Sequence, residues 1–152
     1  MAMTMTGEVT LPAKRPQVWS MLNDPAVLKA CIPGCQSLER TSDSSFSAVA
    51  KIKIGPVSAS FKGKVQLSEI DPPHGYTING EGEGGIAGFA NGGAKVHLAD
   101  APEGTILRYD VTANVGGRIA QMGSRLIDGV AKKMADQFFS SFAATVGGQR
   151  VS

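Results

Sequence analysis

Residues 118–146 read RIAQMGSRLIDGVAKKMADQFFSSFAATV, and this stretch decides the fold. Its apolar side chains recur with a period near 3.6 residues, which is typical of one face of an α-helix. The stripe consists of Ile119, Met122, Leu126, Val130, Met134, Phe138 and Phe142. Gly116-Gly117 precede the segment and Gly147-Gly148 follow it, so the pattern predicts one long helix ended by the second glycine pair.

The sequence upstream of this helix alternates with a period of two. Residues 46–68 place apolar side chains at every second position on either side of the turn Gly55-Pro56. This pattern predicts a half-buried hairpin with one apolar and one polar face. Further strands are predicted at Tyr76–Glu83, Ile86–Leu98 and Thr105–Val115.

The N-terminal part is predicted to hold one strand and two short helices. The strand covers Thr6–Leu11. Pro16 fits the first turn of a helix over Arg15–Asn23. Asp24 can cap a second short helix that begins at Pro25.

A single long helix can bury its apolar stripe only against the apolar face of the sheet, which must therefore curve around it. The sequence thus predicts an α+β fold in which a curved antiparallel sheet wraps one long C-terminal helix, with two short helices after the first strand. We expect one domain over residues 1–152, with residues 1–4 disordered or derived from cloning and residues 147–152 forming a short tail.

The composition excludes several functional classes. Of 152 residues, 42% are hydrophobic and 18% are charged, which suits a globular domain, and the net charge of +2 provides no strong field to recruit nucleic acid. Cys31 and Cys35 have neither zinc-ribbon nor disulfide-framework spacing and are interpreted as free thiols. No apolar run approaches the roughly 18 residues of a membrane span, and no signal peptide is recognisable. The sequence predicts a soluble, cytoplasmic protein.

Gly80, Gly82 and Gly85 satisfy the pattern G-x-G-x-x-G. A dinucleotide site needs this motif between a parallel strand and a helix, because the pyrophosphate binds at the helix N-terminus. Here a strand pattern follows, and Glu81 and Glu83 would repel a phosphate. The glycines therefore indicate a bent strand or a close approach of the backbone.

The histidines and cysteines give no convincing catalytic set. His74 lies in a predicted turn and His97 on the polar face of a predicted strand, so neither a metal site nor a triad is indicated. Cys31 could act as a nucleophile only with a base nearby. We therefore expect no catalysis, no metal and no covalently bound cofactor, and a small enzyme with Tyr109 or His97 as acid or base stays a third hypothesis.

The inward positions of the predicted strands carry more information. They are almost all uncharged and small: Phe46, Ala48, Ala50, Ile52, Ala59, Phe61, Gly63, Val65, Ile78, Gly80, Gly82, Gly88, Ala90, Gly92, Ala94, Val96, Leu107, Tyr109, Val111 and Ala113. Small residues on a facing wall leave volume for a neutral, apolar ligand. They could equally let a sharply bent sheet close on the helix. The residues leave both interpretations open.

Four lysines share the outer face of the first hairpin: Lys51, Lys53, Lys62 and Lys64. Such a face could dock an acidic partner or an anionic lipid. An ordinary solvated surface is the alternative, because local charge discriminates poorly between the two.

The chain resembles the CoxG family of carbon monoxide dehydrogenase subunits, within the START-like, helix-grip (SRPBCC) superfamily. The resemblance runs from about Met5 to Val146. It rests on Ile32-Pro33-Gly34-Cys35, Ile54-Gly55-Pro56-Val57, Phe61-Lys62-Gly63, Asp71-Pro72-Pro73 with Tyr76, Gly80-Glu81-Gly82, Gly104-Thr105, Tyr109, Val115 to Gln121, Gly123 to Ile127, Ala131 to Ala135 and Phe138-Phe139.

This resemblance implies a non-enzymatic accessory protein of a molybdenum hydroxylase of the carbon monoxide dehydrogenase type. It further implies a lipid- or quinone-like ligand in the space between sheet and helix, recruitment of the dehydrogenase to the membrane, and a peripheral location at the inner membrane. The alternative is a protein–protein assembly factor with a filled core.

The predicted ligand-binding residues come from both walls of that space. They are Trp19, Phe61, Ile78, Ala90, Tyr109, Val111, Met122, Leu126, Val130 and Met134. Partner docking is assigned to the four lysines of the first hairpin.

Overall fold

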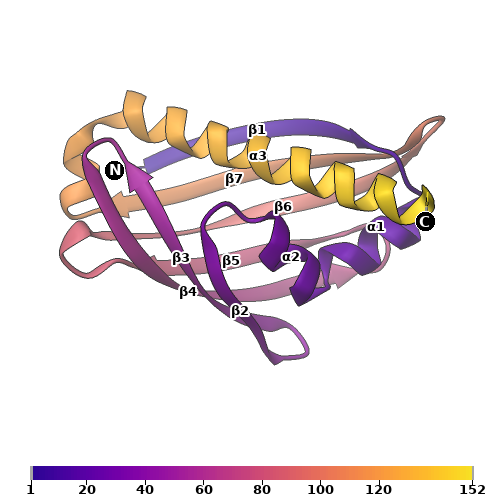
Figure 1. The fold of residues 1–152 in the computed structure, drawn as a ribbon, viewed down its shortest axis with the longest axis horizontal. Helices are drawn as coiled ribbons and strands as arrows, with labels where there is room; N and C mark the ends of the chain where they lie inside the picture. The colour runs from indigo at the N-terminus through magenta and orange to yellow at the C-terminus, as the bar shows by residue number, and fades with distance from the viewer. Residues whose placement is uncertain (1, 152) are drawn as a thin grey trace.

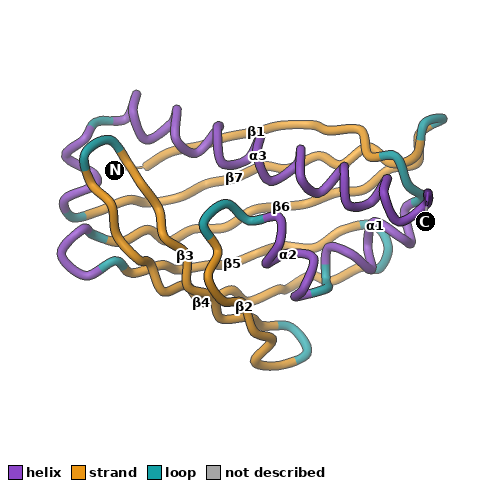
Figure 2. Tube along the Cα trace, in the orientation of Figure 1, coloured by secondary structure: helices purple, strands orange, loops and turns teal. Residues whose placement is uncertain are grey.

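The computed structural model describes residues 2–151, with side chains through Val146, as a curved seven-stranded sheet and one long helix on its concave side (Figure 1). The elements are β1 (Ala2–Leu11), α1 (Arg15–Leu22), α2 (Pro25–Cys31), β2 (Cys35–Ser42), β3 (Ser45–Ile54), β4 (Val57–Asp71), β5 (Gly75–Glu83), η1 (Gly85–Ala87), β6 (Phe89–Ala101), β7 (Gly104–Gly116), η2 (Arg118–Met122) and α3 (Ser124–Val151). Figure 2 shows how strands dominate the chain between α2 and η2.

All neighbouring strands pair antiparallel, in the order β1-β7-β6-β5-β4-β3-β2. Strands β2 to β7 follow one another along the sheet. Strand β1 pairs with β7 along its whole length, from Ala2 opposite Asn114 to Leu11 opposite Thr105. Helices α1 and α2 therefore connect the two edge strands, and the predicted helix-grip architecture is confirmed.

Local sequence explains the two short helices. Pro16 lies in the first turn of α1, and the Asp24 carboxylate accepts a hydrogen bond of 2.9 Å from the backbone N–H of Ala26, which caps α2. The buried Thr105 hydroxyl donates to the Ala13 carbonyl at 2.7 Å. This bond ties the segment between β1 and α1 to β7 and so fixes the position of α1.

The start of the C-terminal helix differs from the prediction. Residues Arg118–Met122 form the 3-10 helix η2, and Gly123, at φ +93°, separates it from α3. A 3-10 helix has three residues per turn, and an α-helix has 3.6. The 3.6-residue period counted from Ile119 therefore does not predict which side chains of α3 face the sheet after Gly123. As a result Ile127 is buried, whereas the predicted core residue Leu126 is 37% exposed.

The end of that helix also differs. The backbone of α3 continues in helical form to Val151, so the prediction that Gly147-Gly148 end the helix is wrong. At the other terminus, β1 includes Ala2 to Thr4, so these residues are paired and not disordered as predicted. Met1 lies outside the described residues.

Two strands differ from the sequence-based prediction. Strand β2 is not evident from the sequence, because this edge strand is interrupted by register shifts at both ends and alternates poorly. Strand β6 begins at Phe89 and not at Ile86, because the chain first turns through η1. Gly85 at φ +62° and Gly88 at φ +124° adopt backbone conformations that favour glycine.

The buried core consists of three separate clusters. The first joins α1, α2 and the C-terminal part of α3 to the sheet around Leu98, Leu107 and Phe142. The second lies around Ile119 and Ile127, at the N-terminal end of α3. The third contains Phe46, Leu67 and Tyr76. The concave face between these clusters forms the candidate site.

Candidate functional site

The middle of the concave face is apolar but not closed. Its inward residues are only half-buried, although they face the side of the sheet that carries α3: Met3, Met5, Ala48, Ala50, Ala59, Phe61, Val65, Ile78, Ala90, Ala94, Val111 and Ala113. By contrast, inward residues within the three clusters, such as Leu98 and Leu107, are almost fully buried. Packed interiors leave few voids, so this central wall is accessible in a way that the clusters are not.

Glycines on this wall fall into two kinds. A Cβ at Gly63, Gly80 or Gly82 would meet its nearest neighbour at 3.5 Å or more, which is an ordinary contact. A Cβ at Gly92 would overlap the Thr112 carbonyl oxygen. Gly92 therefore permits a close approach of two strands. At the other three a methyl group would fit without displacing a neighbour, so close approach of the strands does not require glycine there.

These glycines form a continuous floor. Gly63 pairs with Ala48 on β3 and with Gly82 on β5, and Gly82 pairs with Ala90 on β6. In the next inward row of cross-strand pairs, Gly80 lies between Val65 on β4 and Gly92 on β6. The small residues therefore have two roles. Gly92 is needed for the close approach of β6 and β7, whereas Gly63, Gly80 and Gly82 are small at positions where a methyl group would fit.

Aromatic rings close one end of the concave space. Phe138 stacks on Phe142 with ring centroids 5.6 Å apart and meets Phe139 edge-on at 5.0 Å. Tyr109 stacks on Phe139 at 5.2 Å. A Cβ at Gly7 would overlap the Tyr109 ring, so glycine on β1 allows the tyrosine to lie against that strand.

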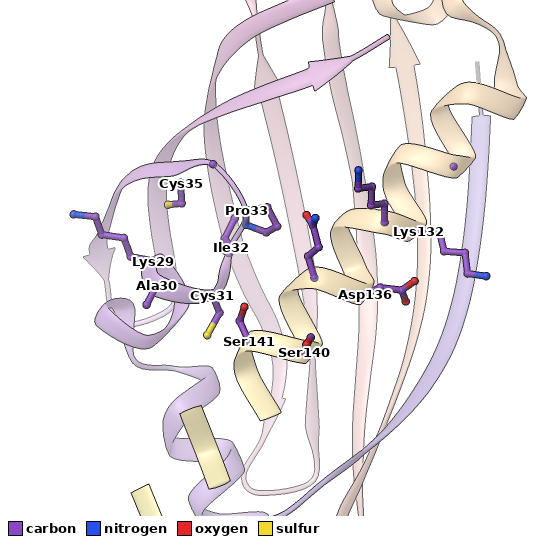
Figure 3. Close-up of a pocket in the computed structure, with 14 residues that line it drawn as sticks. Lys29, Ala30, Cys31, Ile32, Pro33, Cys35, Lys132, Asp136, Ser140 and Ser141 are labelled. Atoms are coloured by element: carbon purple, nitrogen blue, oxygen red, sulfur yellow. The ribbon is translucent and has the colours of Figure 1, made fainter. Parts of the chain in front are cut away.

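A groove follows one flank of α3 where it faces the loop between α2 and β2, and we call it the flank groove (Figure 3). Its volume is about 1020 Å³. In Figure 3 Cys31 and Ser141 face each other across it, whereas Lys29 points away from α3 and Asp136 away from the loop. The charged groups at the groove therefore do not converge on one point.

A second, smaller groove of about 480 Å³ continues toward the N-terminal end of α3 and shares Gly129 and Lys133 with the flank groove. Three of the predicted ligand-binding residues line it: Met122, Leu126 and Val130. A Cβ at Gly55 would lie 3.0 Å from the Leu126 side chain, so the turn between β3 and β4 rests on the start of α3. We call this the apolar groove.

The cysteines in the flank groove show no features of a nucleophile. The Cys35 thiol donates to the Ser37 carbonyl at 3.3 Å, and burial raises its pKa, although the nearby Lys29 ammonium acts in the opposite direction. Cys31 is buried, and its sulfur lies 3.8 Å from the Thr145 hydroxyl. A raised pKa keeps a thiol protonated and unreactive.

The predicted sheet residues lie on the concave face as expected. Phe61, Ile78, Ala90 and Val111 are half-buried there, on four neighbouring strands. Tyr109 is displaced from them toward the β1 edge, where burial and the Asp136 carboxylate both raise its pKa. Whether any of these residues binds a ligand stays a prediction.

The predicted helix residues and Trp19 divide among three places. Met134 is half-buried on α3, and Met122, Leu126 and Val130 line the apolar groove. Trp19 packs on Tyr76, with ring centroids 5.3 Å apart and an interplanar angle of 50°. The indole thus forms part of the wall between the first and third clusters.

The sequence analysis missed Tyr76 as a candidate. It is 7% exposed, and burial raises its pKa to about 12. Its hydroxyl makes no hydrogen bond with any of the described residues. The only signal in the sequence was its alternation with Ile78, Gly80 and Gly82, which places it on the inner face.

The four lysines are exposed on the outer face, but their surroundings differ. Lys62 pairs across strands with Glu83, and Lys64 pairs with Glu81. These acidic residues reduce the positive potential around the two lysines. Lys51 and Lys53 lie opposite Ser60 and Ser58, so no acidic residue on β4 offsets the positive potential around them.

Both histidines are exposed, and His74 Nδ1 lies 2.9 Å from the Arg15 guanidinium. Among the described residues there is no group of three or more His, Cys, Asp or Glu side chains that could hold a metal ion. Gly80 and Gly82 lie in β5, and Gly85 begins a three-residue 3-10 helix that is followed by an antiparallel strand, which is not the context of a dinucleotide site.

A curved antiparallel sheet with a long C-terminal helix on its concave face defines the helix-grip class, and solved structures agree. The chain matches a conserved protein from Geobacillus kaustophilus with a TM-score of 0.90, 33% identity and coverage of 96% of each chain. It also matches a Streptomyces aromatase/cyclase with a TM-score of 0.70 and 13% identity, over 100% of this chain and 97% of the other. A Thalictrum norcoclaurine synthase gives a TM-score of 0.67 and 12% identity, over 99% and 97%.

Within this class the chain belongs to the CoxG family of carbon monoxide dehydrogenase subunits, whose profile matches residues 7–147. The predicted family is therefore confirmed. No curated protein matches the chain. Between residues 2 and 151 there is no helix both long enough and apolar enough to cross a membrane.

The two kinds of glycine predict opposite responses to alanine. Gly92→Ala should lower the free energy of unfolding by about 1–3 kcal/mol, because the added methyl group overlaps the backbone of β7. Gly82→Ala should be neutral or stabilise by about 0.4–1 kcal/mol, because the methyl group has room and the unfolded chain loses freedom. Urea denaturation of both variants checks this, and equal losses would show that the floor around Gly82 is not open.

Because Tyr76 is buried, we expect the free energy of unfolding to fall at high pH, where its hydroxyl ionises. Its pKa is raised from 10.0 to about 12 in the folded state, so its contribution is complete below pH 10 and falls as the pH rises toward 12. The loss should reach about 2–3 kcal/mol across this range. Denaturation at several pH values measures it, and Tyr76→Phe should remove most of the dependence. An equally steep loss in Tyr76→Phe would contradict the assignment.

Proposed function

We propose that the chain binds an apolar, lipid- or quinone-like molecule between the concave face of the sheet and α3. The observation that carries this proposal is the incompletely buried apolar wall beside the three buried clusters, against which part of the wall packs. Apolar surface left open in the interior of a fold costs free energy, which a ligand would recover by covering it. A core filled by its own side chains would bury this wall as completely as Leu98.

The nature of the wall restricts the ligand. Most of the inward residues carry hydrocarbon side chains or none, and no charged residue stands among them. A charged group buried there would lack a partner and would cost several kcal/mol. The ligand is therefore neutral where it contacts the floor of Gly63, Gly80 and Gly82. The aromatase/cyclase and the norcoclaurine synthase share only the fold, and their chemistry does not transfer.

Family membership supports the second part of the proposal, that this chain is a non-enzymatic accessory of a carbon monoxide dehydrogenase-type molybdenum hydroxylase. The cysteine and histidine environments favour an accessory role over catalysis, because neither provides an activated nucleophile or base. Ligand binding and partner docking would use different faces, since the wall is concave and the lysines are on the outside. Recruitment of the dehydrogenase to a membrane belongs to the same proposal.

Filling the floor tests the ligand site. Gly82→Leu should project a side chain into the open centre and reduce retention of bound lipid at least tenfold, because the ligand and the side chain would occupy the same space. Glu81→Leu, on the outer face of the same strand, is the matched control. Native mass spectrometry and organic extraction of protein purified from its source measure the bound molecule. Wild-type protein that carries and binds no apolar molecule would refute the proposal.

Charge substitution tests the docking face. Lys51→Gln with Lys53→Gln should slow association with purified carbon monoxide dehydrogenase several-fold at low salt, because these two lysines lack acidic neighbours across the strands. Lys62→Gln with Lys64→Gln should have a smaller effect, because Glu83 and Glu81 already offset those charges. Surface plasmon resonance at two ionic strengths compares the pairs. Identical kinetics for both variants and wild type would exclude the lysine face as the docking surface.

A further inference from the structure

The Tyr76 hydroxyl lies in the aromatic wall and is nearly buried, yet it has no hydrogen-bond partner among the described residues. It lies on β5, in the inward row that continues through Ile78 and Gly80. Thr105, the other buried hydroxyl, donates to Ala13 at 2.7 Å. Tyr109 extends to the β1 edge beside Gly7. The Tyr76 oxygen makes no hydrogen bond with any side chain or backbone group that the structure describes.

A nearly buried hydroxyl without a protein partner depends on water or on a ligand for its hydrogen bond. The environment of Tyr76 is apolar: burial alone raises its pKa to about 12, so the hydroxyl keeps its proton and can donate. The oxygen is nevertheless not sealed. In the described part of the chain only Arg15 Nε is both fully enclosed and unpartnered. The Tyr76 oxygen therefore borders free space.

The ring that carries this hydroxyl is held firmly. Trp19 packs on one side at a centroid distance of 5.3 Å, and Phe46 and Leu67 complete the third cluster around it. A donor on a fixed ring points in a defined direction, which is how a mainly apolar pocket orients its ligand.

We propose that the Tyr76 hydroxyl donates a hydrogen bond to a neutral oxygen acceptor, such as a carbonyl, on the bound ligand. This inference rests on the proposed function and makes Tyr76 its specificity-determining residue. The site selects amphiphiles that carry an oxygen at this end over pure hydrocarbons, and it fixes their orientation relative to the floor of Gly80 and Gly82.

Tyr76→Phe tests the proposal, because it removes the oxygen and keeps the ring against Trp19. The probes are methyl naphthyl ketone and ethylnaphthalene, which match in shape and differ in the carbonyl. Tyr76→Phe should lower the ratio of ketone affinity to hydrocarbon affinity about three- to tenfold relative to wild type, as the loss of one net hydrogen bond implies. Equilibrium dialysis measures both affinities. Thr77→Val removes a hydroxyl from the outer face of the same strand, where it donates to Glu69 at 3.0 Å, so it is the matched control and should retain the wild-type ratio.

The outcomes separate this inference from the proposed function. An unchanged ratio of ketone affinity to hydrocarbon affinity in Tyr76→Phe would overturn the role of Tyr76 and leave the apolar site intact. Binding of neither probe would overturn both. The stability of unliganded Tyr76→Phe at neutral pH gives an independent readout, because removing an unpaired hydroxyl should not lower it. A marked loss would show that the hydroxyl has a structural partner.

Discussion

The structure depends on a mismatch of size between one helix and seven strands. Strands about 4.8 Å apart make a sheet roughly 29 Å wide, whereas a helix with its side chains is about 10–12 Å across. α3 therefore cannot cover the whole concave face, and the remainder must be filled by large side chains or left open. This chain places glycine and alanine in the middle of the face, at Ala48, Gly63, Gly82 and Ala90, so the sheet contributes few large side chains to the centre.

Because small residues in the middle of the concave face bury little apolar area, most of the stability of the fold must come from the clusters around it. The three clusters have this role: one joins α1, α2 and the end of α3 to the sheet, one holds η2 and the start of α3, and one lies where α1 meets β5. Each contains large side chains buried nearly completely, such as Phe142, Ile119 and Phe46. Because burial is concentrated there, the floor between the clusters can stay accessible without loss of the fold.

Periodicity predicted most of the architecture, because strands of period two and a helix of period 3.6 differ clearly over the long segments. It failed where backbone conformation overrides the pattern. β2 is an edge strand with register shifts, η1 turns the chain before β6, and the break at Gly123 exchanges Leu126 for Ile127 in the buried face. The sequence also could not separate Gly82 from Gly92, because the distinction depends on how closely the neighbouring strand approaches.

Sequence patterns also could not distinguish the surroundings of Tyr76 from those of Tyr109. Both occupy inward positions, and only Tyr109 was predicted to line the ligand site. In the structure Gly7 lets Tyr109 reach the sheet edge near Asp136, whereas Trp19 confines Tyr76 within the interior. How deeply a tyrosine is buried is decided by residues far away in the chain, and alternation cannot reveal it. An interior that discriminates between neutral apolar molecules needs a fixed polar group among hydrocarbon, and Tyr76 meets that requirement where Tyr109 does not.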